Sequence, residues 1–114
     1  MLTDESRYRI LKLLKENPDM SQRQLADTLG VSLGKVNYCL RAMIEKGLIK
    51  VGNLKRRKKK LDYAYLLTPK GLREKARVTL RFLQQKQDEH DVLLGLLEEL
   101  RREASVLRLA EEKE

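Results

Sequence analysis

Six consecutive cationic side chains form the densest charged run of the sequence: Lys55, Arg56, Arg57, Lys58, Lys59 and Lys60. Lysine and arginine at this density favour binding to a polyanion. Residues 48–67 hold seven Lys or Arg and one Asp, a net charge of +6 out of a formal +8 for the whole chain. A basic run by itself is more often a solvated loop, so its function depends on the elements that flank it.

A second set of polar side chains lies upstream, in the segment SLGKVNYCLRAMIEKG. Its apolar residues recur at helical spacing and predict one buried side: Val36, Cys39, Leu40, Met43 and Ile44. The opposite side predicts a surface that can contact bases and phosphates: Ser32, Leu33, Gly34, Lys35, Asn37, Tyr38 and Arg41. An asparagine can pair with adenine through two hydrogen bonds, and an arginine can pair with guanine or hold a phosphate. Gly34 would let the backbone approach a groove closely.

Two helices should precede this segment. The first runs from about Asp4, which can cap it, to Glu16, with Ile10, Leu11 and Leu14 as its buried stripe. The second begins with a capping box and ends at a glycine able to adopt the left-handed conformation, and its expected residues are Ser21, Gln24, Leu25, Ala26, Leu29 and Gly30. Ser32 is expected to cap the third helix and Gly47 to end it.

The hydrophobic period then changes. LIKVGNL and LDYAYLL are short and rich in β-branched or aromatic residues, so they predict a hairpin with the basic run at its tip. In the second strand one face should hold Leu61, Tyr63, Tyr65 and Leu67. The tyrosines are expected to pack against the third helix.

A helical pattern resumes at Thr68, a possible cap, and Pro69, and it continues to about Ala110. Apolar or small residues at steps of four and three predict a seam that includes Leu72, Ala76, Thr79, Leu83, Leu93, Leu97, Leu100, Ala104 and Leu107, interrupted by Lys86 and His90. A chain of 114 residues has nothing to cover so long a seam, which would run roughly 60 Å at 1.5 Å per residue. The seam therefore predicts a homodimer formed through a coiled coil.

Charge along this helix favours an antiparallel pair. Residues 68–87 carry a net charge of +5, whereas residues 88–114 carry −5. Opposite halves attract in the antiparallel arrangement, which places His90 near the crossing. The expected architecture is thus mainly α with a small β-hairpin: a domain over residues 1–67 and a long C-terminal dimerisation helix over residues 68–114.

Helix-turn-helix geometry fits Gln22 to Arg41 closely, because small Ala26 and Gly30 stand where two helices would cross and turn. The hairpin after the third helix would be the wing of a winged helix, with Lys55–Lys60 on phosphates or in a minor groove. Double-stranded DNA is therefore the expected partner.

The sequence holds no constellation typical of an enzyme, and no cofactor or metal is expected. His90 has no Cys or His companions, and Cys39 lies on a buried helix face, where an inert residue is expected. One cysteine, no signal segment and no membrane-spanning run predict a soluble cytoplasmic protein that associates with the nucleoid when bound.

The segment SQRQLADTLGVSLGKVNYCLRAMIEKGLIKV followed by AYLLTPKG resembles the MarR-type winged helix, and VSLGKVNYCL with LLTPKG is most similar to small MarR-like regulators associated with exopolysaccharide gene clusters. The resemblance covers nearly the whole chain. It implies a dimeric bacterial transcriptional regulator with Ser32 to Arg41 in the major groove and the hairpin as wing.

Two features depart from the wider MarR pattern. The sequence starts at the first helix of the winged domain, and Asp62, Tyr63 and Ala64 stand where the family has Asp-x-Arg. These departures argue against the usual small-ligand pocket, leave an effector open and assign minor-groove contact to Lys55–Lys60. Two other interpretations stay open: an architectural DNA-binding protein without sequence preference, and a protein-interaction module.

Overall fold

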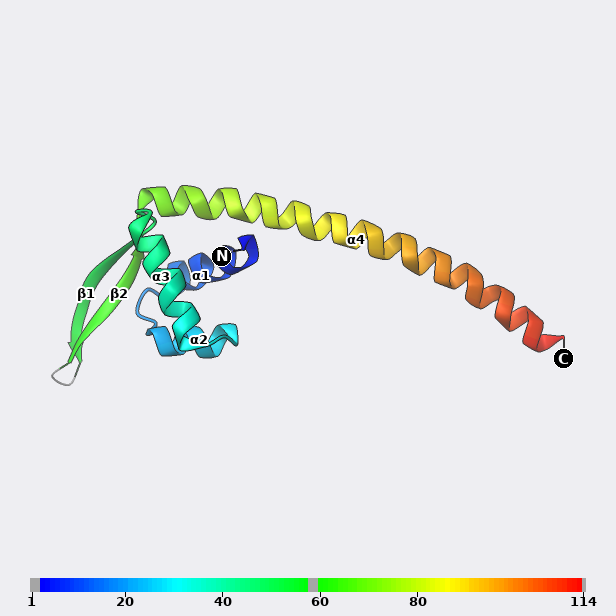
Figure 1. Cartoon of the computed structure of the whole chain (residues 1–114), viewed down its shortest axis with the longest axis horizontal. Coiled ribbons are helices and arrows are strands. Elements are labelled where there is room, and N and C mark those ends of the chain that lie inside the picture. The colour runs from blue at the N-terminus through cyan, green and yellow to red at the C-terminus, as the bar shows by residue number, and fades with distance from the viewer. Residues whose placement is uncertain (1–2, 58–59, 114) are drawn as a thin grey trace. The chain divides into compact units, whose positions relative to one another are not determined.

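The computed structural model describes residues 3–57 and 60–113, and within the hairpin it leaves the side chains of residues 53–63 undescribed. The elements follow the expected order (Figure 1): α1 (Asp4–Glu16), α2 (Gln22–Leu29), α3 (Leu33–Glu45), β1 (Ile49–Arg57), β2 (Lys60–Leu67) and α4 (Pro69–Glu112). The predicted class, mainly α with one hairpin and a long C-terminal helix, is confirmed. The chain forms two compact units, residues 1–82 and 83–114.

Side-chain caps fix where the first two helices begin. Thr3, not the predicted Asp4, caps α1, because its Oγ1 accepts a hydrogen bond from Ser6 N at 3.1 Å. Asp4 instead lies in the first helical turn. The capping box of α2 is confirmed: Ser21 Oγ accepts from Gln24 N at 3.1 Å, and Gln24 Oε1 accepts from Ser21 N at 2.9 Å.

The ends of α2 and α3 follow the prediction, and the buried side of α3 follows it with one exception. Gly30 and Gly47 adopt positive φ angles of 68° and 74°, and Ser32 Oγ caps α3 by accepting from Lys35 N. Ile44 was expected on the buried side but is 36 % exposed. It lies at the edge of the arc centred on Val36, Leu40 and Met43, so the core does not cover it.

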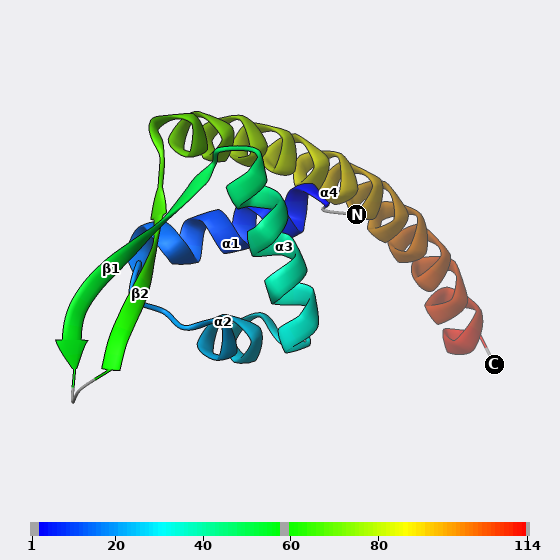
Figure 2. The same ribbon diagram turned by 60° about the vertical axis from the view of Figure 1, so that its left-hand side comes forward.

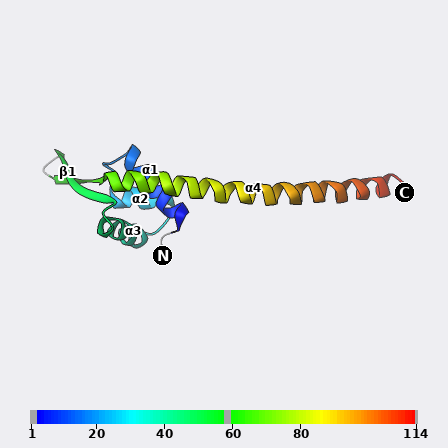
Figure 3. The same cartoon turned by 90° about the horizontal axis from the view of Figure 1, so that it is seen from above.

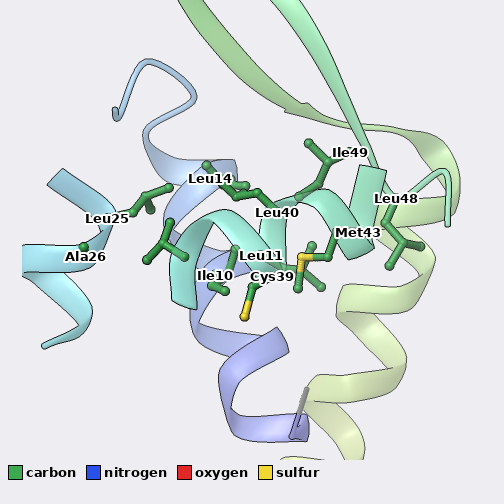
Figure 4. Packing of buried hydrophobic residues seen from close by; sticks show 11 residues of the cluster. Ile10, Leu11, Leu14, Leu25, Ala26, Cys39, Leu40, Met43, Leu48 and Ile49 are labelled. Carbon is green, nitrogen blue, oxygen red and sulfur yellow. The ribbon is translucent and has the colours of Figure 1, made fainter. Parts of the chain in front are cut away.

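The core joins the three short helices to the start of β1 (Figure 4). Its buried side chains come from α1, α2, α3 and the first residues after α3: Ile10, Leu11, Leu14, Leu25, Ala26, Val36, Cys39, Leu40, Met43, Leu48 and Ile49. Leu29 and Val31 are only partly buried against this cluster. Each fully buried leucine contributes about 1.5–3 kcal/mol, so this contact holds α3 at a fixed angle to α1 and α2.

The hairpin is a two-stranded antiparallel sheet. Ile49 pairs with Leu67 and Gly52 with Ala64, and the register shifts between Asn53 and Arg56. Of the predicted inner face, Tyr65 and Leu67 pack against the core. The side chains of the other two members, Leu61 and Tyr63, lie outside the described residues.

The N-terminal turns of α4 pack against the head, the part of the chain formed by α1, α2, α3 and the base of the hairpin, and no sequence pattern predicted this contact. Thr68 caps the helix as predicted, with its Oγ1 accepting from Gly71 N at 3.0 Å. Gly71 and Val78 are buried, and Phe82 stacks on Tyr8 of α1 at 5.1 Å between ring centroids. Figures 2 and 3 show these turns running beside α1. The compact unit therefore extends to Phe82, beyond the expected boundary at residue 67.

The rest of α4 forms the second unit, and its apolar side chains are open to solvent. The expected dimerisation positions of this unit are exposed at Leu83, Leu93, Leu100 and Leu107 and half-buried at Leu97 and Ala104. Leu72 and Ala76, which are seam positions in the first unit, are also exposed. Thr79, another seam position, is half-buried and donates to the carbonyl oxygen of Lys75 at 2.6 Å. None of the described helices is long and apolar enough to cross a membrane.

Candidate nucleic-acid interface

α2 and α3 pack through one face each, which leaves the other face of α3 open. Leu25 and Ala26 of α2 lie in the same core cluster as Val36 and Leu40 of α3. The turn between the helices is closed by Val31 N, which donates to the carbonyl oxygen of Ala26 at 3.1 Å. The two helices thus form the helix-turn-helix expected from the sequence.

Most residues predicted for the recognition surface lie on the open face of α3 and around its N-terminus. The exposed members are Ser32, Leu33, Gly34, Lys35, Tyr38 and Arg41. Tyr38 is 59 % exposed and Leu33 is 46 % exposed, so both side chains are accessible to a partner. A Cβ at Gly34 would meet nothing within 4 Å, so its backbone is open to a close-approaching partner.

Asn37 differs from these neighbours because the protein already holds its side chain. It is half-buried, and its Nδ2 donates to Oε1 of Gln22 at 3.1 Å. Gln22 in turn donates from Nε2 to the hydroxyl oxygen of Tyr65 at 3.0 Å. Gln22 was not among the residues predicted from the sequence, and Tyr65 was predicted to pack only. No local pattern marks this contact, since it joins α3, α2 and β2 across long sequence separations.

The base of the hairpin is tied to the helices by main-chain contacts. Tyr65 N donates to the carbonyl oxygen of Pro18 in the connection between α1 and α2, at 3.1 Å. Thr68 N donates to the carbonyl oxygen of Leu48 at 3.1 Å, where α3 leads into β1. These bonds fix the direction in which the hairpin leaves the head.

The cationic run lies where the two strands join, as predicted. β1 ends at Arg57 and β2 begins at Lys60. Lys58 and Lys59 lie outside the described residues, as do the side chains of Lys55, Arg56, Arg57 and Lys60. The position of the run at the hairpin tip is thus established by the strands, while DNA contact by its side chains stays a prediction.

A polar cluster joins the start of α1 to α4 within the same compact unit. Arg81 donates from Nε and Nη2 to the two carboxylate oxygens of Asp4, both at 3.1 Å. Glu74 lies 3.8 Å from guanidinium nitrogens of both Arg7 and Arg81. The hydrogen bond from Arg81 holds the pKa of Asp4 below its ordinary value. Sequence spacing gave no signal for this cluster.

Cys39 is buried beneath α3 and carries a free thiol. Burial raises the pKa of this thiol above its ordinary value, because the charged thiolate is disfavoured away from water. The thiol therefore stays protonated near neutral pH and serves as a small apolar side chain of the core. In the described part of the chain no three His, Cys, Asp or Glu side chains gather into a possible metal-binding group.

The comparison with protein families gives a match over the three short helices and the start of β1. Residues 3–50 match the family model described as winged helix-turn-helix DNA-binding. No curated protein sequence matches the chain.

Several solved structures share the fold. A MarR-family transcriptional regulator from Rhodococcus sp. RHA1 aligns over 66 % of this chain and 51 % of its own, with 24 % identity and a TM-score of 0.53. The PcaV regulator of Streptomyces coelicolor, solved with its natural ligand, aligns over 86 % and 74 %, with 21 % identity and a TM-score of 0.62. MepR of S. aureus, solved in complex with DNA, aligns over 76 % and 61 %, with 20 % identity and a TM-score of 0.59.

The chain spans about half the length of the Rhodococcus regulator. At these identities the likeness establishes the fold. Residues 3–50 therefore match a winged helix-turn-helix DNA-binding model, and the chain shares the fold of MarR-family transcriptional regulators.

Proposed function

We propose that the protein is a MarR-type transcriptional regulator that binds a two-fold symmetric DNA site as a homodimer. The observation that carries the proposal is the division of α3 into two faces. Val36, Leu40 and Met43 anchor one face in the core, and the other presents Tyr38 and neighbouring polar side chains to solvent. A helix anchored in this way can enter a major groove about 12 Å wide.

The side chains on and beside the open face of α3 have distinct roles in the proposed complex. Arg41 pairs with guanine or a phosphate, and Asn37 pairs with adenine. Tyr38 contacts a base or a phosphate through its hydroxyl. Ser32 and Lys35 lie at the N-terminal end of α3, where phosphates favour the positive end of the helix dipole.

The wing supplies affinity without sequence preference. Lys55–Lys60 lie along phosphates or enter the adjacent minor groove. At the start of α3, Leu33 and Gly34 allow that helix to approach the major groove closely. If each wing neutralises about three phosphates, two wings contribute a slope of roughly −5 to log K against log salt concentration.

Dimerisation through α4 is supported by the exposed apolar side chains of its second unit. Leu93, Leu100 and Leu107 are 53 %, 49 % and 65 % exposed in the single chain, a larger apolar surface than a stable monomer usually leaves open. The basic and acidic halves of α4 favour an antiparallel pair, with His90 near the crossing. The sequence resemblance to small MarR-like regulators associated with exopolysaccharide gene clusters is the reason to include exopolysaccharide genes among the proposed targets.

The first test is selection from a randomised duplex library at near-physiological salt, followed by sequencing of the retained DNA. An enriched inverted repeat supports a dimeric regulator, and the half-site spacing reports the distance between the two recognition helices. Retention without an enriched motif contradicts sequence-specific regulation and favours the second candidate, an architectural DNA-binding protein, for which the cationic wing is the specific supporting feature. No retention contradicts both candidates.

Helix pairing has a separate test by disulfide crosslinking in a Cys39→Ala background. The antiparallel arrangement brings a cysteine at position 72 of one copy near one at position 107 of the other. Mixed Leu72→Cys and Leu107→Cys proteins should form a heterodimeric crosslink, and Leu72→Cys alone should not crosslink with itself. Efficient self-crosslinking of Leu72→Cys without the mixed product would contradict the antiparallel pair.

A further inference from the structure

Three polar side chains form a continuous chain of hydrogen bonds behind the recognition surface. Asn37 Nδ2 donates to Gln22 Oε1 at 3.1 Å, and Gln22 Nε2 donates to the Tyr65 hydroxyl at 3.0 Å. Both bonds are partly buried, and they join the recognition helix to the first residue of α2 and to β2 at the base of the wing. We call these three residues the amide relay.

The relay leaves a defined set of hydrogen-bonding groups on Asn37. A side-chain amide has two N–H donors and one carbonyl acceptor. One N–H is used by Gln22, so the second N–H and Oδ1 remain. Adenine in the major groove offers an N6 donor and an N7 acceptor, which these two groups match. Asn37 also lies one turn from both Leu33 and Arg41, on the side of α3 proposed to face DNA.

We propose that Gln22 is a positioning residue for base recognition: with Tyr65 it holds the Asn37 amide in the orientation that selects adenine at one position of each half-site. This rests on the proposed sequence-specific binding of DNA. The relay restricts the Asn37 side chain before DNA arrives, so less rotational freedom is lost when the base pair is engaged. Gln22 contributes to the choice of base without contacting that base.

The relay also explains why a half-buried asparagine is compatible with this position. An unbonded amide that is partly removed from water is costly, whereas each amide of the relay has a protein partner. Removing the middle member frees Asn37 to rotate and to satisfy its amide elsewhere. Base preference should therefore fall while the packing of α2 on α3, which depends on Leu25 and Ala26, persists.

The experiment compares the randomised-library profiles of the wild-type protein and five variants: Asn37→Ala, Gln22→Ala, Gln22→Glu, the double variant Gln22→Ala with Asn37→Ala, and Gln85→Ala. Gln85→Ala is the matched control, because it makes the same chemical change at an exposed position of α4. Thermal denaturation of every variant verifies folding. Each enriched site is then titrated with all four bases at the adenine position and over a series of salt concentrations.

The expected result is a loss of base preference at one position of each half-site, the adenine position. Asn37→Ala should reduce the preference for adenine about ten-fold, and Gln22→Ala should reduce it about three-fold or more at the same position, with an unchanged salt slope. Gln22→Glu retains an acceptor for Asn37 and for the Tyr65 hydroxyl, so it should keep the preference while weakening binding to all sites through its negative charge. Adding Asn37→Ala to Gln22→Ala should cost less than Asn37→Ala alone.

Two results overturn the inference. If the wild-type protein enriches a motif and Gln22→Ala retains its full base profile, Gln22 does not position Asn37. If Gln22→Ala weakens binding equally to every sequence, Gln22 contacts phosphate or supports the fold only. A wild-type protein that enriches no motif overturns the proposed regulator itself. That outcome differs from the first two because the wild-type protein then shows no base preference at any position.

Discussion

Replacing Gly71 by alanine should destabilise the protein, although alanine is the better helix former. A Cβ at this position would collide with the backbone carbonyl oxygen of Leu48 and lie 3.1 Å from Leu67 Cδ2. A carbonyl in the main chain cannot rotate away as a side chain can. The start of α4 must therefore retreat from the residue that leads into β1.

The magnitude follows from the bonds that this retreat would break. Thr68 N donates to the carbonyl oxygen of Leu48 at 3.1 Å, and Thr68 Oγ1 donates to the carbonyl oxygens of Gly47 and Leu48 at 2.6 Å and 3.2 Å. Hydrogen bonds of this kind contribute about 1 kcal/mol each. After allowing for the helix propensity of alanine, at most about 1 kcal/mol, the expected loss is about 2 kcal/mol. For a chain of this size that lowers Tm by about 8 °C.

The matched control is Gly95→Ala on the same helix. No atom lies within 4 Å of a Cβ at Gly95, so helix propensity acts alone there and should raise Tm. Thermal unfolding of both variants, followed by circular dichroism at equal protein concentration, measures whether Tm falls in Gly71→Ala and rises in Gly95→Ala. A Gly71→Ala protein as stable as the wild type would refute the close approach of α4 to Leu48.

Three further predictions concern charge and burial. Replacing all six cations of Lys55–Lys60 by glutamine should remove about 5 from the magnitude of the salt slope and leave the preferred motif unchanged, as measured by fluorescence anisotropy over a salt series. Asp4→Asn should lower Tm at neutral pH, because it removes the carboxylate that binds Arg81. Since Arg81 depresses the pKa of Asp4, the difference in Tm between wild type and variant is present above the ordinary pKa of 3.8 and vanishes as the pH falls through the depressed pKa. Thermal melts over a series of pH values measure this difference. Cys39 should react slowly with a thiol reagent in the native protein and rapidly in denaturant, and fast native reaction would contradict its burial.

Local chemistry explains what could be predicted from the sequence. The capping box of Ser21 and Gln24, the left-handed Gly30 and Gly47 and the change of hydrophobic period at the hairpin all act within a few residues. These signals predicted the element order and the buried side of α3. Even the errors are small in extent: the cap of α1 moved by one residue to Thr3, and Ile44 lies at the edge of the buried face.

Contacts between distant segments had no such signal. Periodicity predicted an apolar dimerisation seam along α4 that includes Leu72, and pairing through this seam stays a prediction. The helix also buries a different face, through Gly71 and Val78, against the three short helices and the hairpin base. That second face depends on the angle at which α4 leaves the hairpin, which periodicity does not encode. The same holds for Asn37, whose spacing placed it on the open face and whose Gln22 partner only the folded chain brings near.

The amide relay should couple substitutions at its three positions during evolution. A substitution at Gln22 that cannot replace its hydrogen bonds makes Asn37 and Tyr65 find other partners, and each bond that stays unmet in this partly buried position costs about 1–3 kcal/mol. Such a loss is a large fraction of the stability of a small domain. Relatives that descend from this chain should therefore exchange residues 22, 37 and 65 together, and a new base preference should arise in one concerted step instead of by gradual change.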